Sequence, residues 1–143
     1  MKVAVKKLHP DAHLPTCGSQ FAAGADLYSV EAVTIAPGQT AFVHTGLAME
    51  IPVGYGGFVF ARSGLACKRD LAPANKVGVI DADYRGEIMV ALHNHGTTPQ
   101  QLEAGERIAQ MVIMPYLAAE YFEAEELSDT QRGEGGFGSS GRK

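Results

Sequence analysis

Large apolar residues alternate with polar or small residues over several short segments of the chain. In Gly86–Asn94 the even positions Ile88, Val90 and Leu92 are large and apolar, whereas the odd positions are mixed in character. This period of two predicts a strand with one buried face. Further strands are predicted where β-branched, aromatic or alternating apolar residues gather, at Val33–Ile35, Thr40–Val43, Gly57–Phe60 and Arg107–Met114.

Glycine and proline separate these segments. Pairs such as Pro37-Gly38 and Gly56-Gly57 recur at close intervals, and a short helix is expected only within Leu65–Leu71. Many short strands joined by regular turns are typical of a sandwich, a barrel or a jelly roll. We therefore expect an all-β fold with at most one short helix.

The C-terminal end differs in composition from the rest of the chain. Residues 118–130 include five acidic residues and no basic one, and Arg132–Lys143 holds five glycines and a single apolar side chain, Phe137. We expect a β-rich domain over residues 1–131 and a flexible Gly-rich arm over residues 132–143. Phe137 is then either part of a frayed end or the ring of a flap that closes over a bound ligand.

Length, charge and cysteine content exclude several classes of function. The 143 residues are enough to bury one core without metal or disulfide support. A net charge of −4 without a long basic run disfavours nucleic-acid binding. The longest apolar run, Ile88–Leu92, is too short to span a membrane, and no signal peptide is recognisable. Cys17 and Cys67 match no metal or redox spacing, so we expect reduced thiols in a cytoplasmic protein.

Two short segments combine arginine, serine and glycine, the residue types that bind phosphate. The C-terminal arm has the glycine spacing of a dinucleotide-binding turn, but that turn needs a following helix, and only five residues follow Gly138. Its glycines still leave backbone N–H groups free to surround an anion. Arg62-Ser63-Gly64 offers similar donors after an expected strand. Two such clusters in an acidic chain indicate a polyphosphate ligand, with side-chain donors at Arg62, Ser63, Arg132, Ser139 and Ser140.

The segment Gly78–Gly86 places two carboxylates, Asp81 and Asp83, two positions apart beside a tyrosine and an arginine. Such a segment is either a solvated hairpin end or a site in which Asp81 acts as a general base or as an acceptor for metal-bound water. His93 and His95 also have the spacing of two ligands on a strand face. Zinc is disfavoured there because no third cysteine or histidine lies nearby in the sequence.

Taken together, these segments resemble in order and spacing the trimeric dUTP pyrophosphatases (dUTPases). Two positions depart from the usual family pattern: Ala61 stands where proline is usual, and Ser140 where threonine is frequent, and neither change removes a functional group. The resemblance runs from residue 23 to the end of the chain. The five family motifs correspond to Ala23–Ser29, Ala61–Ala66, Gly78–Gly86, Gly105–Gln110 and Arg132–Gly141.

The resemblance implies a jelly-roll-like β fold assembled as a homotrimer, with three active sites at the subunit junctions. Each site would take the second and fourth motifs from one subunit, the third from another, and the arm from the remaining one. The implied reaction is hydrolysis of dUTP to dUMP and pyrophosphate with Mg²⁺ on the triphosphate. Such an enzyme limits uracil incorporation into DNA and supplies dUMP for dTMP synthesis.

The family resemblance also implies roles for single residues at the phosphates. Asp81 is expected to orient and deprotonate the water that attacks the α-phosphorus. Asp26 is expected to hold metal-bound water or to orient Arg107, with no direct protein ligand to Mg²⁺. Further donors to the triphosphate are expected from Arg62, Ser63, Gly64 and Gln110.

Selection of the nucleoside is expected from the third motif and the arm. The backbone of Val79, Ile80 and Asp81 would pair with uracil and reject cytosine, which presents a donor where an acceptor is needed. Tyr84 would pack on the deoxyribose and exclude a 2′-hydroxyl, and Phe137 would stack over the uracil. The remaining contacts are expected from Asn75 and Met89 at the base and from Arg132, Gly138, Ser139 and Ser140 at the outer phosphates.

Two other functions are compatible with the same scaffold. A dCTP deaminase would share the fold but needs a catalytic glutamate in the central motif, where this chain has Asp81. A nonenzymatic nucleotide-binding regulator is the second alternative, and the presence of both Asp81 and the whole arm argues against it.

Overall fold

The structure is a computed structural model that describes residues 1–136. Within these residues it contains twelve strands and one helix, and all paired strands are antiparallel. This confirms the expected mostly β fold with one short helix. The strands are β1 (Ala4–Lys7), β2 (Thr16–Cys17), β3 (Ala25–Tyr28), β4 (Val33–Ile35), β5 (Thr40–His44), β6 (Leu47–Glu50), β7 (Tyr55–Phe60), β8 (Leu71–Pro73), β9 (Gly78–Ile80), β10 (Met89–Asn94), β11 (Gln100–Leu102) and β12 (Arg107–Pro115), and the helix is α1 (Ser63–Arg69).

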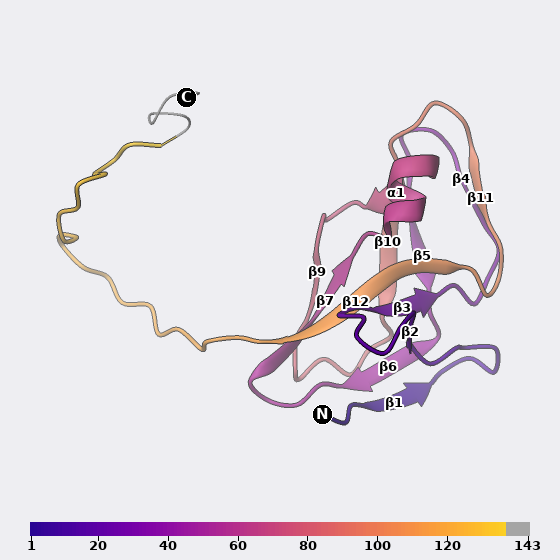
Figure 1. Cartoon of the computed structure of the whole chain (residues 1–143), viewed down its shortest axis with the longest axis horizontal. Helices are drawn as coiled ribbons and strands as arrows, with labels where there is room; N and C mark the ends of the chain where they lie inside the picture. Colours follow the sequence, from indigo (N-terminus) through magenta and orange to yellow (C-terminus); the bar gives the residue numbers. More distant parts are fainter. Residues whose placement is uncertain (137–143) are drawn as a thin grey trace.

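The largest sheet has five strands in the order β2-β3-β12-β7-β9 (Figure 1). Its central strand, β12, is also the longest, and Gln110 on it lies opposite Asp26 on β3 and Phe60 on β7. Strand β9 forms one edge of this sheet, because β7 is its only strand partner within residues 1–136. The central strand therefore brings together segments that are more than thirty residues apart in sequence.

A three-stranded sheet, β5-β10-β8, and the pairs β1-β6 and β4-β11 complete the body. The period of two predicted around β10 is confirmed, since Ile88, Val90 and Leu92 are 1%, 2% and 0% exposed. The strand itself begins only at Met89, because Ile88 donates its backbone N–H to Leu47 before the ladder with β5 starts. The buried cluster also includes Leu27, Ile35, Val43, Leu47, Ile51, Leu71, Leu102 and Ile108.

Helix α1 is displaced from its predicted position by two residues. It begins directly after Arg62, whose backbone is extended, and it buries Leu65 against the core. It ends at Asp70, whose φ of 53° is left-handed and closes the last turn through a hydrogen bond to the Leu65 carbonyl. Leu71, which was expected inside the helix, instead begins β8.

After β12 the chain leaves the body. Residues 116–136 form neither helix nor strand and run outward from the strands (Figure 1). In the described part of the chain, the last backbone hydrogen bond to the body is donated by Tyr116 to the Gly54 carbonyl. Four large apolar side chains of this outward segment are at least 84% exposed: Leu117, Tyr121, Phe122 and Leu127. No helix within residues 1–136 is long and apolar enough to cross a membrane.

Candidate active site

Asp26, Arg62 and Arg107 form one ion-paired cluster on the five-stranded sheet. Asp26 lies on β3, Arg107 begins β12, and Arg62 follows β7, so that the pairing of β12 with both neighbours brings the three together. The Asp26 carboxylate accepts hydrogen bonds from Arg62 Nε at 2.7 Å and from Arg107 Nη1 at 3.3 Å. Its side chain is 14% exposed. Two guanidinium groups thus share one carboxylate, which leaves an excess of positive charge at this surface.

Backbone and amide donors surround the same cluster. Gln110 donates from Nε2 to the Ala61 carbonyl at 2.9 Å, and this contact fixes the chain just before Arg62. Ser63 and Gly64 are exposed at the start of α1, and a Cβ at position 64 would meet no atom within 4 Å. The backbone around Gly64 is therefore open to a ligand. Together these groups provide the donors that an oxyanion requires.

Strand β9 and the loop after it border a cavity of about 220 Å³. Because β9 is an edge strand, the side of its backbone facing away from β7 has no strand partner within the described residues. Its central residue, Val79, is 60% exposed. Unpaired N–H and C=O groups of an edge strand can pair with a planar ligand such as a nucleobase. The cavity is lined by Phe42, Asn75, Val79, Ile80, Asp81, Tyr84, Glu87, Met89 and Ala91.

The Tyr84 side chain is folded back onto its own loop. Its hydroxyl donates a hydrogen bond to the Glu87 carbonyl at 2.8 Å. A Cβ at position 86 would lie only 2.6 Å from the Tyr84 ring carbon Cζ, so this ring position requires Gly86. Tyr84 remains 41% exposed, which leaves ring surface available at the cavity.

Asp81 directly follows β9 and is exposed. Its backbone carbonyl accepts the Tyr84 N–H at 3.1 Å, which closes the turn between them. Asp81 borders two hollows, the 220 Å³ cavity and a more open one of about 530 Å³ that Asp83, Arg85 and Tyr116 also line. A carboxylate between two hollows is placed to contact a ligand and a water molecule at the same time.

Within residues 1–136, the start of the C-terminal arm makes no hydrogen bond to either cluster. Arg132 donates from Nε to the Gly135 carbonyl at 2.6 Å, and Gly135 donates its N–H to the Arg132 carbonyl at 3.1 Å. Gly133 donates its N–H to both the carbonyl and the hydroxyl of Thr130. Four predicted site residues lie outside the described residues: Phe137, Gly138, Ser139 and Ser140.

Within residues 1–136, no group of three or more histidine, cysteine, aspartate or glutamate side chains could hold a metal ion. The His93 and His95 rings lie 4.5 Å apart in an edge-on arrangement, and His93 Nδ1 is hydrogen bonded to the Thr40 hydroxyl at 2.8 Å. Cys17 and Cys67 are both free and exposed.

Residues 10–141 match the sequence model of the dUTPase family. The chain belongs to the dUTPase family. It is 50% identical over 142 residues to the deoxyuridine 5'-triphosphate nucleotidohydrolase of Nautilia profundicola, covering 99% of this chain and 100% of that one. It is 51% identical over 144 residues to the corresponding protein of a Hydrogenobaculum strain, covering 100% of both chains.

Solved dUTPase structures have the same fold. A mutant dUTPase of Staphylococcus bacteriophage 80alpha with dUpNHpp superimposes with a TM-score of 0.92 at 32% identity, covering 98% of each chain. A mutant dUTPase from phage phi11 of S. aureus, in which a structural Mg(II) ion is coordinated, gives a TM-score of 0.82 at 27% identity, covering 88% of this chain and 98% of that one. The resemblance inferred from the motifs is confirmed at the level of family and fold.

In this dUTPase the predicted residues form two groups. Asp26, Arg62 and Gln110 gather around β12, with Ser63 and Gly64 at the adjoining start of α1. The second group lines the 220 Å³ cavity and comprises Asn75, Val79, Ile80, Asp81, Tyr84 and Met89. Within the described residues, no hydrogen bond or ion pair joins the two groups.

Three residues that line the same cavity were not predicted: Phe42, Glu87 and Ala91. Phe42 and Ala91 lie opposite each other on β5 and β10, and no motif covers them. Glu87 directly follows the third motif. The only sequence signal for it is its position next to Gly86, which gives no indication of what its carboxylate contacts.

Proposed function

We propose that this dUTPase hydrolyses dUTP to dUMP and pyrophosphate, with Asp81 acting on the attacking water. The observation that carries the proposal is the position of Asp81 at the end of edge strand β9, between a cavity of about 220 Å³ and a more open hollow. Full-length relatives with about half of their residues identical bear the name of this activity. In the cell, the reaction limits uracil incorporation into DNA and supplies dUMP for dTMP synthesis.

In the proposed reaction, the Asp81 carboxylate orients a water molecule and accepts its proton as the water oxygen bonds to the α-phosphorus. The bond from the α-phosphorus to the bridging oxygen breaks, and pyrophosphate leaves with that electron pair. A positioned general base contributes typically about 10²–10⁴-fold to a rate. The exposed setting of Asp81 means that orientation of the water by neighbouring groups matters as well.

The triphosphate is proposed to bind at the cluster around β12. Arg62, Gln110 and the exposed start of α1 supply donors for the phosphate oxygens, and donors of this kind stabilise the charge that develops on the leaving group. Both Asp26 oxygens already accept arginine hydrogen bonds, so Asp26 suits an outer role toward metal-bound water better than direct coordination. Mg²⁺ held by the triphosphate would neutralise part of its negative charge, and Asp26 would contact the ion only through water.

The nucleoside is proposed to occupy the cavity beside β9. The open backbone edge at Val79, Ile80 and Asp81 would pair with uracil, and Asn75 and Met89 line the same space. Tyr84 would pack on the deoxyribose, where a 2′-hydroxyl would clash with its ring. A site built on hydrogen bonds rejects a mismatched base far more strongly than an apolar slot does.

A homotrimer with shared active sites accounts for the separation of these groups. Within residues 1–136 no hydrogen bond or ion pair joins the phosphate cluster to the nucleoside cavity, and residues 116–136 run outward from the body (Figure 1). We propose that one subunit supplies the phosphate cluster, a second the nucleoside cavity, and a third the arm. In this arrangement Phe137 stacks on the uracil, and Arg132, Gly138, Ser139 and Ser140 contact the outer phosphates. The free thiols Cys17 and Cys67 suit a reducing compartment, and we propose a cytoplasmic location.

The activity is tested by pyrophosphate release from dUTP, dCTP, dTTP and UTP in the presence of Mg²⁺. We expect release from dUTP alone at an appreciable rate, and ammonia release from dCTP would instead identify a deaminase. Asp81→Asn keeps the shape of the side chain and removes the base, so it should bind dUpNHpp but lose most turnover. Asp11→Asn, an exposed carboxylate in the loop between β1 and β2, is the matched control. Near-normal turnover by Asp81→Asn would contradict the assignment.

A further inference from the structure

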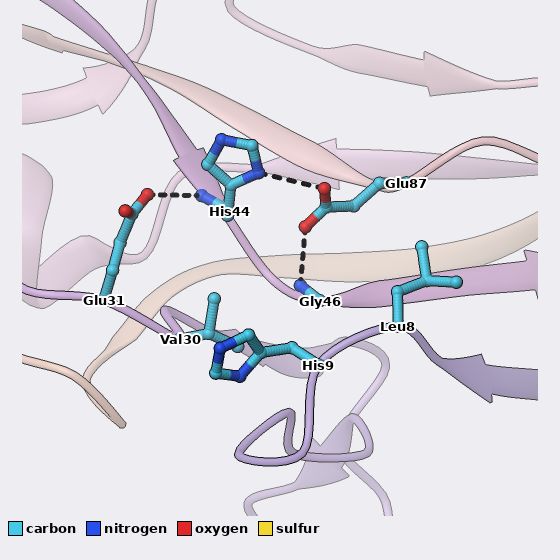
Figure 2. A pocket seen from close by; sticks show the side chains of 7 residues that line it. All are labelled: Leu8, His9, Val30, Glu31, His44, Gly46 and Glu87. Carbon is cyan, nitrogen blue, oxygen red and sulfur yellow. Dashed lines mark hydrogen bonds and ion pairs between the residues drawn. The ribbon is translucent and has the colours of Figure 1, made fainter.

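The Glu87 carboxylate anchors the end of the third motif to the turn between β5 and β6. Oε1 accepts the Gly46 backbone N–H at 2.8 Å, and Oε2 lies 2.9 Å from His44 Nδ1 (Figure 2). The Glu87 side chain is only 24% exposed. Both of its oxygens are therefore occupied by protein groups that lie more than forty residues earlier in the sequence.

The chain next to Glu87 is fixed to the same turn by its backbone. Ile88 donates its N–H to the Leu47 carbonyl at 2.8 Å, and its own carbonyl accepts the Thr45 hydroxyl at 2.6 Å. Thr45 and Ile88 are 0% and 1% exposed. The position of the peptide groups at residues 87 and 88 is thus set by buried hydrogen bonds and by the Glu87 side chain together.

The Glu87 backbone carbonyl in turn holds the Tyr84 hydroxyl at 2.8 Å. Tyr84 has no other side-chain hydrogen bond in the described part of the chain, and its ring packs over Gly86, where a Cβ would collide with it. Glu87 also lines two cavities, the nucleoside cavity and the one drawn in Figure 2. A movement of the Glu87 peptide would therefore move the tyrosine ring.

We propose that Glu87 is a positioning residue that fixes the Tyr84 ring and, through it, the selection of 2′-deoxyribose over ribose. This inference rests on the proposed function, in which Tyr84 packs on the sugar. Rejection of a single additional hydroxyl requires a ring that cannot retreat by the space of one oxygen atom. The hydrogen bonds from Gly46 to Glu87 and from Tyr84 to Glu87 supply that rigidity.

The test compares kcat and KM for dUTP and UTP in Glu87→Ala, Glu87→Gln and Tyr84→Phe, together with their melting temperatures. Glu87→Ala removes the anchor, and Tyr84→Phe removes only the hydroxyl that the anchor holds. We expect Glu87→Ala and Tyr84→Phe each to raise the ratio of kcat/KM for UTP to that for dUTP by about five- to tenfold, as loss of one hydrogen bond of ordinary strength would. Most of the change should appear in KM for UTP. Combined in one chain, the two changes should give no more than either alone, because they act on the same contact.

Two further variants separate positioning from a general loss of stability. Glu87→Gln keeps an oxygen for the Gly46 N–H and places an amide opposite His44 Nδ1. This variant should therefore have the same ratio of kcat/KM for UTP to that for dUTP as the wild type. Glu31→Gln is the matched control, since Glu31 lines the cavity drawn in Figure 2 and accepts the His44 backbone N–H at 3.5 Å. Within residues 1–136 it makes no hydrogen bond to the loop that carries Tyr84. Its ratio should equal that of the wild type.

The outcomes are distinguishable. The role of Glu87 would be overturned if Glu87→Ala left the ratio of kcat/KM for UTP to that for dUTP unchanged. This includes the case in which kcat/KM falls equally for both substrates together with the melting temperature. An additive effect in the double variant would overturn the route through Tyr84. Wild-type chain that does not hydrolyse dUTP would overturn the proposed function and this inference together, whereas an active wild type with an unchanged ratio in Glu87→Ala leaves the function standing.

Discussion

Replacing Asp26 by alanine would leave Arg62 and Arg107 without the carboxylate that they share. Asp26 accepts from Arg62 Nε at 2.7 Å and from Arg107 Nη1 at 3.3 Å. Its side chain is 14% exposed and that of Arg62 is 23% exposed, so this pair is largely shielded from water. Arg107 is 51% exposed, and solvent screens its contribution. The variant therefore mainly leaves a partly buried guanidinium unpaired.

The expected magnitude lies between two limits. Removing one partner of a fully buried pair costs about 3–5 kcal/mol, and an exposed pair is worth about 0.2–1 kcal/mol. Because the Arg62 pair is shielded but not fully buried, we expect Asp26→Ala to lower the free energy of unfolding by about 2 kcal/mol. Asp26→Asn keeps an oxygen for Arg62 Nε and should lose about half as much, since the hydrogen bond remains while the charge is lost.

The measurement is urea unfolding at neutral pH and at one fixed protein concentration, because subunit association shifts apparent stability. The loss should largely persist at about 1 M salt, where exposed pairs are screened within about 3 Å. Asp129→Ala is the control, because Asp129 is exposed and makes no ion pair within residues 1–136. If Asp26→Ala and Asp129→Ala unfold at the same urea concentration, the cluster is not a stabilising unit and the reasoning is refuted.

Two further predictions concern pH and the arm. The hydrogen bond to Glu87 raises the pKa of His44 above its usual 6.5. Partial burial lowers this pKa, and the negative charges of Glu87 and Glu31 raise it further. Protonated His44 therefore stabilises the folded protein through its interaction with Glu87. This stabilisation is fully present below pH 6.5 and is lost as the pH rises through the raised pKa of the folded state. The melting temperature of the wild type should therefore exceed that of His44→Gln by more at about pH 5.5 than at about pH 8.5. Because the His44 side chain is 44% exposed, we expect the pair with Glu87 to contribute only about a few tenths of a kcal/mol to stability. An equal difference in melting temperature at both pH values would contradict the assignment of this stabilisation to protonated His44. Deletion of residues 132–143 should remove most turnover with little change in melting temperature, because no hydrogen bond after Tyr116 reaches the body in the described chain; full turnover by the truncated chain would show that the arm is dispensable.

The local pattern of the sequence determined those features that depend on neighbouring residues. Alternation identified the buried face at Ile88, Val90 and Leu92, and the Pro-Gly turn signal at Gly38 coincides with a positive φ of 72°. The five motifs were sufficient to identify the family. They were sufficient because the chemistry of phosphate and base recognition restricts the residue types at each position, whatever strands surround them.

Several short strands were not predicted in this way. Strands β2, β8 and β9 have two or three residues each, which is too few to display a period of two. The equally short β4 was predicted because all three of its residues are β-branched, which is not true of the other three. In β1 only one of four residues is even partly buried, so its pattern carries no clear alternation. These strands exist because neighbouring strands supply hydrogen-bonding partners. The partners of β1, β8 and β9 lie far away in sequence, whereas β2 pairs with the next strand along the chain.

Only the tertiary structure decided which functional groups meet. Asp26 and Arg62 are 36 residues apart and are joined because β12 pairs with β3 on one side and β7 on the other. Strand order also decides that β9 lies at the edge of its sheet, and tertiary packing brings Glu87 to Gly46, 41 residues earlier in the sequence. Periodicity and motifs report what each segment contains, whereas strand order and register depend on how all the segments together bury one core. The sequence therefore determined the chemistry of this dUTPase, and the packing of its strands determined where that chemistry is assembled.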